Sequence, residues 1–303
     1  AENDLHEGFM VCIPQRQMCS SMPAALAHWS NTEISLENED DFEPEVIESI
    51  DEQDVRRTGT LVSELAKIAA STDVLGQLIK DDSKFKALEN NLNDYFSAHP
   101  EEKVIIFSYF RSTLSYLEKR LEQSGHAPLL LMGGMKDKKS EVIEEFSQVP
   151  TRRILLASEV LSEGVDLQFC STLINYDLPW NPMRVEQRIG RIDRIGQQRP
   201  KINILNFFYQ DTLDDKIYDR LFRRLDIFRQ ALGDLEAVLG AKIRSLTSQL
   251  LGHSLSAEQE IEAINQTASA IEQDRLETER LEDQAVHLHA YSDYINRKVD
   301  AAK

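Results

Sequence analysis

The sequence predicts an α/β fold in which a parallel sheet is covered by helices on both faces and is followed by an all-helical extension. Short apolar runs are continuous rather than alternating, which indicates strands buried on both faces. Amphipathic stretches with apolar residues every three or four positions lie between these runs, and beyond Asp211 only the helical spacing continues. Strands and helices that alternate in this way build a parallel sheet between two layers of helices.

The expected elements of the sheet begin at Asp82. This residue can cap a helix that runs to Phe96, because its side chain accepts hydrogen bonds from the first helical turn. Two further amphipathic helices are expected over residues 114–121 and 138–146. The apolar runs expected to form strands are Val104–Phe107, Leu129–Met132, Arg153–Ala157, Thr172–Asn175 and Lys201–Phe207.

The chain divides into three expected segments. Residues 1–81 form a helical lead-in and an acidic loop, residues 82–232 the α/β lobe, and residues 233–303 a helical extension. In the extension, Ser256 and Gln259 have the spacing of a capping box, which opens a helix. Its apolar face is expected to carry Ile261, Ile264, Ala268 and Ile271.

Composition bounds the class of protein. The 303 residues include 41% hydrophobic and 28% charged ones, with no apolar run long enough for a membrane and no apolar leader, so we expect a cytoplasmic protein. The three cysteines form no C-x-x-C pair, and we expect no metal site. A net charge of −18 argues against binding nucleic acid by bulk charge. The charge is uneven, however: residues 33–54 hold eleven acidic residues, whereas residues 184–199 hold five arginines.

The strongest functional signal is Gln187-Arg-Ile-Gly-Arg-Ile-Asp-Arg-Ile-Gly-Gln197, which spaces Arg188, Arg191 and Arg194 three residues apart. On a helix this spacing brings Arg191 and Arg194 to adjacent turns on one side. Guanidinium groups presented together suit an anion with several oxygens, such as a nucleotide triphosphate. Arg188 faces another way and either braces the helix or contributes to the site. A solvated basic face is the alternative for an isolated arginine pair.

This run resembles motif VI of superfamily 2 helicases, and its end, Arg194–Gln197, narrows the resemblance to the SWI/SNF-type ATPases. Upstream, Lys103–Leu114 is similar to motif IV, Ile154–Leu167 to motif V, and Asp177–Pro182 to the D-x-x-W-N-P element of that family. The resemblance implies a RecA-like second motor lobe. Departures from eukaryotic remodellers within motifs V and VI favour a bacterial or archaeal duplex-DNA translocase.

The resemblance also implies that part of the motor lies elsewhere. The chain contains no G-x-x-x-x-G-K-[ST] phosphate loop and no D-E-x-H box, which in this family belong to the first lobe. We therefore expect ATP with Mg²⁺, the Mg²⁺ held mainly by a separate first lobe. We also expect no ATP hydrolysis by this chain alone.

On the nucleotide side, the resemblance assigns Arg191 and Arg194 to the γ-phosphate and to the charge of the transition state. Gln187 is expected to position the nucleotide or to link the lobes. Gly164 permits a close backbone approach, and Asp166 accepts a hydrogen bond from the ribose or from an arginine of motif VI. A turn that packs the sheet is the alternative for Gly164 and Asp166.

On the nucleic-acid side, contacts to the DNA backbone are expected in the loops after the strands, where open α/β sheets bind ligands. Such contacts carry no sequence information. For the two glycines a plain turn is the alternative, and for the tryptophan packing within the lobe. The candidates are Ser108, Arg111, Gly133, Gly134, Ser158 and Trp180.

The leading hypothesis is therefore the second lobe of an ATP-dependent double-stranded DNA translocase. Its expected partners are duplex DNA, the first motor lobe and, through the C-terminal helices, another protein. A non-catalytic interaction module built on a relic lobe is one alternative, against which the intact arginine pair argues. Half of an RNA helicase is the other, against which the W-N-P element argues.

Overall fold

A five-stranded parallel sheet forms the centre of the molecule. The computed structural model describes residues 14–31, 63–64, 67–68, 70–71, 74–133, 135, 138–158, 167–179, 182–192, 201–219, 242–243, 245–246, 249–250, 255–274, 276–277 and 280. The strand order is β2-β3-β1-β4-β5, and every pairing is parallel. The expected α/β fold is thus confirmed. The strands are β1 (Val104–Phe107), β2 (Leu129–Leu131), β3 (Ile154–Ala157), β4 (Thr172–Asn175) and β5 (Asn203–Asn206).

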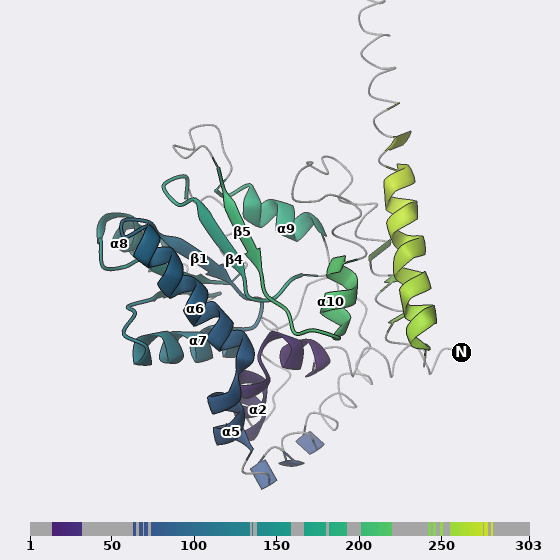
Figure 1. Ribbon diagram of the computed structural model, residues 1–303, viewed down its shortest axis with the longest axis horizontal. Helices are drawn as coiled ribbons and strands as arrows, with labels where there is room; N and C mark the ends of the chain where they lie inside the picture. The colour runs from purple at the N-terminus through teal and green to yellow at the C-terminus, as the bar shows by residue number, and fades with distance from the viewer. Residues whose placement is uncertain are drawn as a thin grey trace, which may run out of the picture.

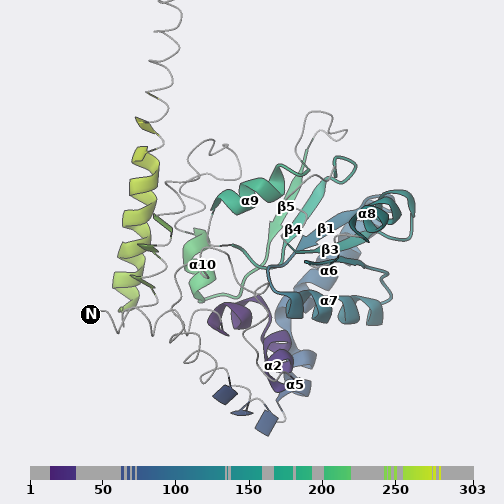
Figure 2. The ribbon, with the colours of Figure 1, turned by 180° about the vertical axis from the view of Figure 1, so that it is seen from behind.

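Helices flank this sheet, as Figures 1 and 2 show from opposite sides. Two more helical stretches, residues 14–20 and residues 257–274, lie near the ends of the described chain. Among the described helices, none is long and apolar enough to cross a membrane. The named helices are α2 (Met22–Asn31), α5 (Leu75–Asp81), α6 (Ser83–Ala98), α7 (Arg111–Gln123), α8 (Lys139–Gln148), α9 (Pro182–Ile189) and α10 (Leu213–Ile217).

One face of the sheet is covered by α6 and α7. The α6 helix begins as expected, since the Asp82 side chain accepts a hydrogen bond from the backbone N–H of Phe85 at 3.0 Å. Burial of its apolar stripe then removes large hydrocarbon surfaces from water, which is the main favourable term in folding. The fully buried side chains of this face include Phe85, Leu88, Leu114, Leu117, Val104, Ile106 and Leu156.

The opposite face is covered by α8. Because side chains alternate along a strand, the intervening strand residues Ile105, Phe107 and Leu155 point to this side. They pack with Phe146 of α8 and with Ile192, which follows α9. Every residue of β1, β3 and β4 is buried, as expected for strands covered on both sides.

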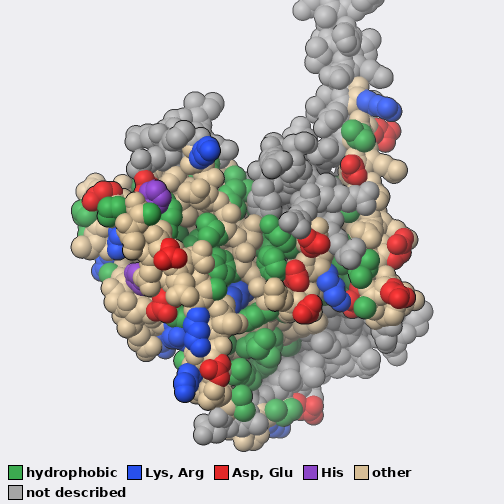
Figure 3. Space-filling view, in the orientation of Figure 1, with side chains coloured by type: hydrophobic (Ala, Val, Ile, Leu, Met, Phe, Trp, Pro, Cys, Tyr) green, Lys and Arg blue, Asp and Glu red, His purple; other side chains and the backbone are tan. Residues whose placement is uncertain are grey.

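The C-terminal helical segment packs against α9 and α10. Buried Val185 of α9 and Ile217 of α10 share one apolar cluster with Ile264, Ala268 and Ile271. The segment opens with the expected capping box: the Ser256 N–H donates to Gln259 Oε1 at 2.8 Å, and the Gln259 N–H donates to Ser256 Oγ at 3.3 Å. Its opposite side is exposed, and acidic side chains are spread over it in Figure 3.

The chain leaves the neighbouring strands β1 and β4 in opposite directions. These strands are neighbours, yet β1 continues through α7 on one face, whereas β4 continues through α9 on the other face, where Arg188 lies over the Phe107 ring. Strands whose connections leave in opposite directions define a topological switch point, the usual ligand position in open α/β sheets.

Candidate active site

The loops that follow three strands meet at the carboxyl edge of the sheet. The backbone N–H of Ser108 donates to Ala157 O at 3.2 Å, and that of Ser158 donates to Leu131 O at 3.1 Å. The N–H of Tyr176 donates to Phe107 O at 2.8 Å. The ladder therefore continues one residue beyond each strand, and this fixes the positions of the loops that open there.

Asp177 ties two of these loops together. Its carboxylate is 4% exposed and accepts hydrogen bonds from Ser108 Oγ at 2.5 Å, the Tyr109 N–H at 2.8 Å and Ser20 Oγ at 2.6 Å. A buried carboxylate is tolerated only when donors replace its water shell. Ser108 is fully buried in this arrangement. Its hydroxyl is committed to Asp177 rather than presented on the surface as the expected DNA contact.

Arg188 fixes α9 to the sheet. Its side chain is 2% exposed, and Nη1 donates to Asn175 Oδ1 at 2.8 Å and to the carbonyl of Asp177 at 3.2 Å. The guanidinium lies 5.2 Å from the centre of the Phe107 ring. Of the two roles open for this arginine, the geometry favours that of a brace.

Arg191 lies in the turn directly after α9. Its N–H donates to Arg188 O at 3.2 Å, and the N–H of Ile192 donates to Ile189 O at 2.9 Å. Because Arg188 and Ile192 are both buried, the backbone of Arg191 is held from both sides. Gln187 lies on α9 four residues before Arg191, and both residues are half-buried.

The remaining candidates divide by what the structure describes. Arg111 is the first residue of α7 and is half-buried, as is Gly133 after β2. Ser158 is buried directly after β3. Ser108, Arg111, Gly133 and Ser158 thus follow the strands at the carboxyl edge, whereas Gln187 lies on α9 and Arg191 directly after it. Gly134, Gly164, Asp166, Trp180 and Arg194 lie outside the described residues.

Comparison with known proteins bears on this edge. The helicase conserved C-terminal domain matches residues 83–196, which include β1 to β4 and α9. This match supports the C-terminal helicase lobe expected from the sequence over these residues.

Individual relatives and solved structures match the chain in part. This chain is 40% identical over 139 residues to the uncharacterized ATP-dependent helicase YqhH of Bacillus subtilis (strain 168), which is 46% of this chain and 25% of that protein. The chain thus spans about a quarter of that relative. The C-terminal part of the Fun30 ATPase domain is 23% identical, with 69% of this chain and 71% of that chain covered and a TM-score of 0.45. The Pyrococcus furiosus Hef helicase domain is 20% identical over 54% of this chain and 33% of that chain, with a TM-score of 0.39.

The helicase lobe also contains a buried lysine that sequence reasoning missed. Lys84 Nζ donates to the carbonyls of Cys19 and Ser20, both at 2.9 Å, and lies 4.7 Å from the centre of the Tyr176 ring. Burial lowers the pKa of Lys84 to about 8 against the opposing attraction of nearby carboxylates, chiefly Asp177. A signal was present in the sequence, because Lys84 precedes the buried leucines of α6 at intervals of four.

A metal site was not expected, and the acidic side chains of the lobe are dispersed. Among the residues that the structure describes, no group of three or more His, Cys, Asp or Glu is placed to hold a metal ion. The buried Asp82 carboxylate instead accepts a hydrogen bond from Tyr116 Oη at 2.7 Å. Arg120 Nη1 donates to that same phenol oxygen at 2.7 Å, so this carboxylate belongs to the packing of α6 on α7.

Proposed function

We propose that this chain is the C-terminal lobe of a SWI/SNF-type, ATP-dependent translocase of double-stranded DNA. ATP is held by a separate first lobe, and this lobe supplies Arg191 and Arg194 to its phosphates. The observation that carries the proposal is the anchoring of α9 to Asn175 and to the Asp177 carbonyl by Arg188, with Arg191 in the turn directly after this helix. The helicase-domain match and the printed name of the Bacillus relative support the use of ATP.

The arginines act by electrostatic stabilisation. A positive group that is already in place where negative charge develops needs no reorganisation during the reaction. Two buried neighbours hold the backbone of Arg191, which supports such a role for its side chain. Arg194 is proposed to share this role, and Gln187, Gly164 and Asp166 to hold the nucleotide.

The available groups fit one half of a nucleotide site. Gln187 on α9 and Arg191 after it are both partly exposed as residues, and amide and guanidinium N–H groups are donors suited to phosphate oxygens. Mg²⁺ is proposed to be held mainly by the first lobe, where it neutralises phosphate charge. The contribution of this chain is positive charge from arginine.

The DNA backbone is proposed to lie along the loops that open at the same edge. α7 starts there, and its N-cap residue Phe110 has no side-chain cap bond, so the partial positive charge of a helix N-terminus lies at this edge. Arg111, the first residue of α7, adds a formal charge. Gly133, Gly134, Ser158 and Trp180 complete the proposed contact set, while Ser108 acts indirectly by holding Asp177.

The deciding experiment is ATPase turnover by the parent protein, without nucleic acid, with duplex DNA and with RNA. We expect stimulation by duplex DNA and its loss in an Arg191→Ala/Arg194→Ala variant that still folds. The matched control is Arg152→Ala at the opposite edge of the sheet, which should turn over normally. Displacement of a third strand from duplex DNA would then measure translocation. Stimulation by RNA alone would indicate an RNA helicase, and absence of turnover would indicate an interaction module.

A further inference from the structure

At the topological switch point between β1 and β4, a segment from near the start of the chain packs onto the sheet. Ser20, fully buried, donates its hydroxyl to Asp177 Oδ2 at 2.6 Å and lies 2.9 Å from Thr113 Oγ1 on α7. Residues 14–31 therefore reach the place where open α/β sheets usually bind ligands. Figures 1 and 2 both show α2 of this segment against the base of the lobe, beside α7.

A second contact, made by Lys84, attaches residues 14–31 to the lobe. The Lys84 ammonium donates hydrogen bonds to the carbonyls of Cys19 and Ser20, at the end of the helical residues 14–20. Within the segment, Trp29 Nε1 donates to buried Gln17 Oε1 at 2.9 Å. The segment is thus preorganised by its own packing and joined to the lobe by charge-assisted hydrogen bonds, which are stronger than neutral ones.

A short path of hydrogen bonds leads from Ser20 to α9 and the turn after it, residues 182–192, here called the arginine helix. The carboxylate of Asp177 holds Ser20, and the carbonyl of the same residue accepts from Arg188. Arg188 in turn accepts, through its own carbonyl, the N–H of Arg191. One buried residue therefore contacts both the N-terminal segment and the residue that positions Arg191.

We propose that Asp177 is a positioning residue that links the seating of residues 14–31 to the arginine helix, so that ATP turnover depends on this segment being docked. The inference rests on the proposed role of Arg191 and adds to it a means of control. When Ser20 leaves, Asp177 loses one of its three donors. A buried carboxylate that loses a donor must be rehydrated or moved, and either change displaces the carbonyl that holds Arg188.

The test uses the parent protein, with Ser20→Ala, Arg188→Lys and the double variant. Ser97→Ala is the matched control, because Ser97 is exposed on α6 and its hydroxyl bonds only within that helix. Ser20→Ala should lower the DNA-stimulated kcat about three- to tenfold and leave the KM for ATP within about twofold. The double variant should lose less than the product of the two single losses, because both changes break one path.

Hydrogen exchange provides a readout that does not depend on turnover. In Ser20→Ala the amides of Arg191 and Ile192 should exchange faster, while those of β1 and β3 should keep their protection. Uniformly faster exchange would mean a general loss of stability and would overturn the proposal, as would kcat losses that simply multiply. Should Ser20→Ala fail to fold, Asp177→Asn keeps the shape of the side chain, removes its charge and is expected to give the same pattern.

The two proposals fail in different ways. If Arg191→Ala leaves turnover unchanged, the proposed function is wrong. If Arg191→Ala abolishes turnover while Ser20→Ala and Asp177→Asn both behave as Ser97→Ala does, the proposed function stands and the positioning role is wrong.

Discussion

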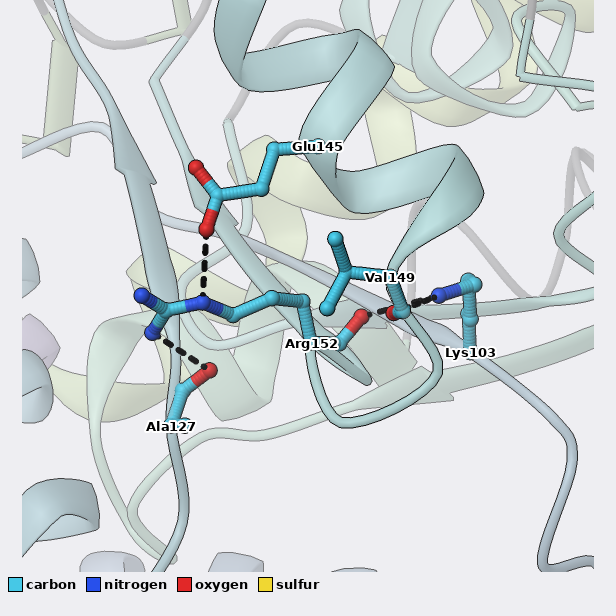
Figure 4. Close-up of polar contacts among 5 residues, drawn as sticks. All are labelled: Lys103, Ala127, Glu145, Val149 and Arg152. Atoms are coloured by element: carbon cyan, nitrogen blue, oxygen red, sulfur yellow. Dashed lines mark hydrogen bonds and ion pairs between the residues drawn. The ribbon is translucent and has the colours of Figure 1, made fainter.

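At both edges of the central sheet, charged side chains bind neighbouring segments of the chain, but these side chains differ in their exposure to solvent. At the amino edge, Lys103 Nζ donates to the carbonyls of Val149 at 2.9 Å and Arg152 at 3.0 Å (Figure 4). Arg152 Nε pairs with Glu145 at 2.8 Å, with side-chain exposures of 35% and 42%. At the carboxyl edge, Arg188 and Asp177 are nearly inaccessible to solvent.

This difference separates what a fold requires from what a site requires. Partly exposed pairs such as Arg152 with Glu145 cost little to form and contribute little. Buried charges cost several kcal/mol in desolvation, by order of magnitude, and an apolar replacement is often as stable. At the amino edge, partly exposed hydrogen bonds and an ion pair hold the connection between α8 and β3, and their desolvation cost is small. The carboxyl edge, by contrast, holds the buried charges of Arg188 and Asp177, whose hydrogen bonds fix α9 and the loop after β1.

The largest expected effect compares one arginine at each edge. Arg191→Ala in the parent protein should lower DNA-stimulated turnover about 10³-fold or more, as for the loss of a transition-state arginine. Arg152→Ala should leave turnover within about twofold. Steady-state ATPase assays at saturating duplex DNA measure both. Equal losses at the two edges would remove the functional distinction between them.

The next effect concerns the stability that each edge supplies. Arg188→Met leaves Asn175 Oδ1 and the Asp177 carbonyl without this donor and should cost on the order of 3 kcal/mol in the free energy of unfolding. Lys103→Met, which is only partly buried, should cost about 1 kcal/mol. Urea denaturation of the two variants checks the difference. A larger loss for Lys103→Met would reverse the comparison.

A pH effect sharpens the contrast further. The pKa of Lys84 is lowered from 10.5 to about 8 by burial, although Asp177, Asp214, Cys19 and Asp82 oppose the shift. Between these values the unfolded chain binds the proton and the folded chain does not, so stability rises with pH, by at most about 1.4 kcal/mol per pH unit. Urea midpoints from pH 7 to 10, with Lys84→Met as reference, measure this rise. Parallel curves for the two proteins would contradict the assignment.

The smallest effect is expected at the amino edge. Arg152→Ala removes a partly exposed ion pair and should cost less than about 1 kcal/mol at low salt. The cost should shrink as salt is added, because exposed pairs are screened. Thermal unfolding in low and high salt tests this. A cost independent of salt would show that packing of the side-chain stem, rather than charge, dominates.

The strands of the sheet could be predicted from the sequence because each is indicated by a short run of neighbouring residues. The continuous apolar run Val104–Phe107 became β1 with its predicted bounds, and Asp82 capped α6. The strand β5 was expected to run from Lys201 to Phe207 but spans only Asn203–Asn206. It is largely half-exposed at the edge of the sheet, where an apolar pattern constrains the ends of a strand weakly.

The site was less predictable because it is assembled over long distances. Ser20 and Asp177 are 157 residues apart in sequence, and no periodic pattern relates two such positions. Arg188 could be placed on a helix but not assigned to the interior, because its partners, Asn175 and the Asp177 carbonyl, become neighbours only after β4 and α9 pack. Local patterns thus indicated which loops gather at the edge, and tertiary packing decided which side chains meet there.

Lys84 donates a hydrogen bond to the carbonyl of Cys19. The buried thiol of the same residue can report whether the segment is docked. Burial, assisted by nearby Asp214, raises the pKa of the Cys19 thiol to about 12. Only a thiolate attacks alkylating reagents readily, so Cys19 should be inert while residues 14–31 are seated. The rate of alkylation of this thiol would then measure how often the segment undocks from the lobe. The wild-type protein can be used without an introduced label.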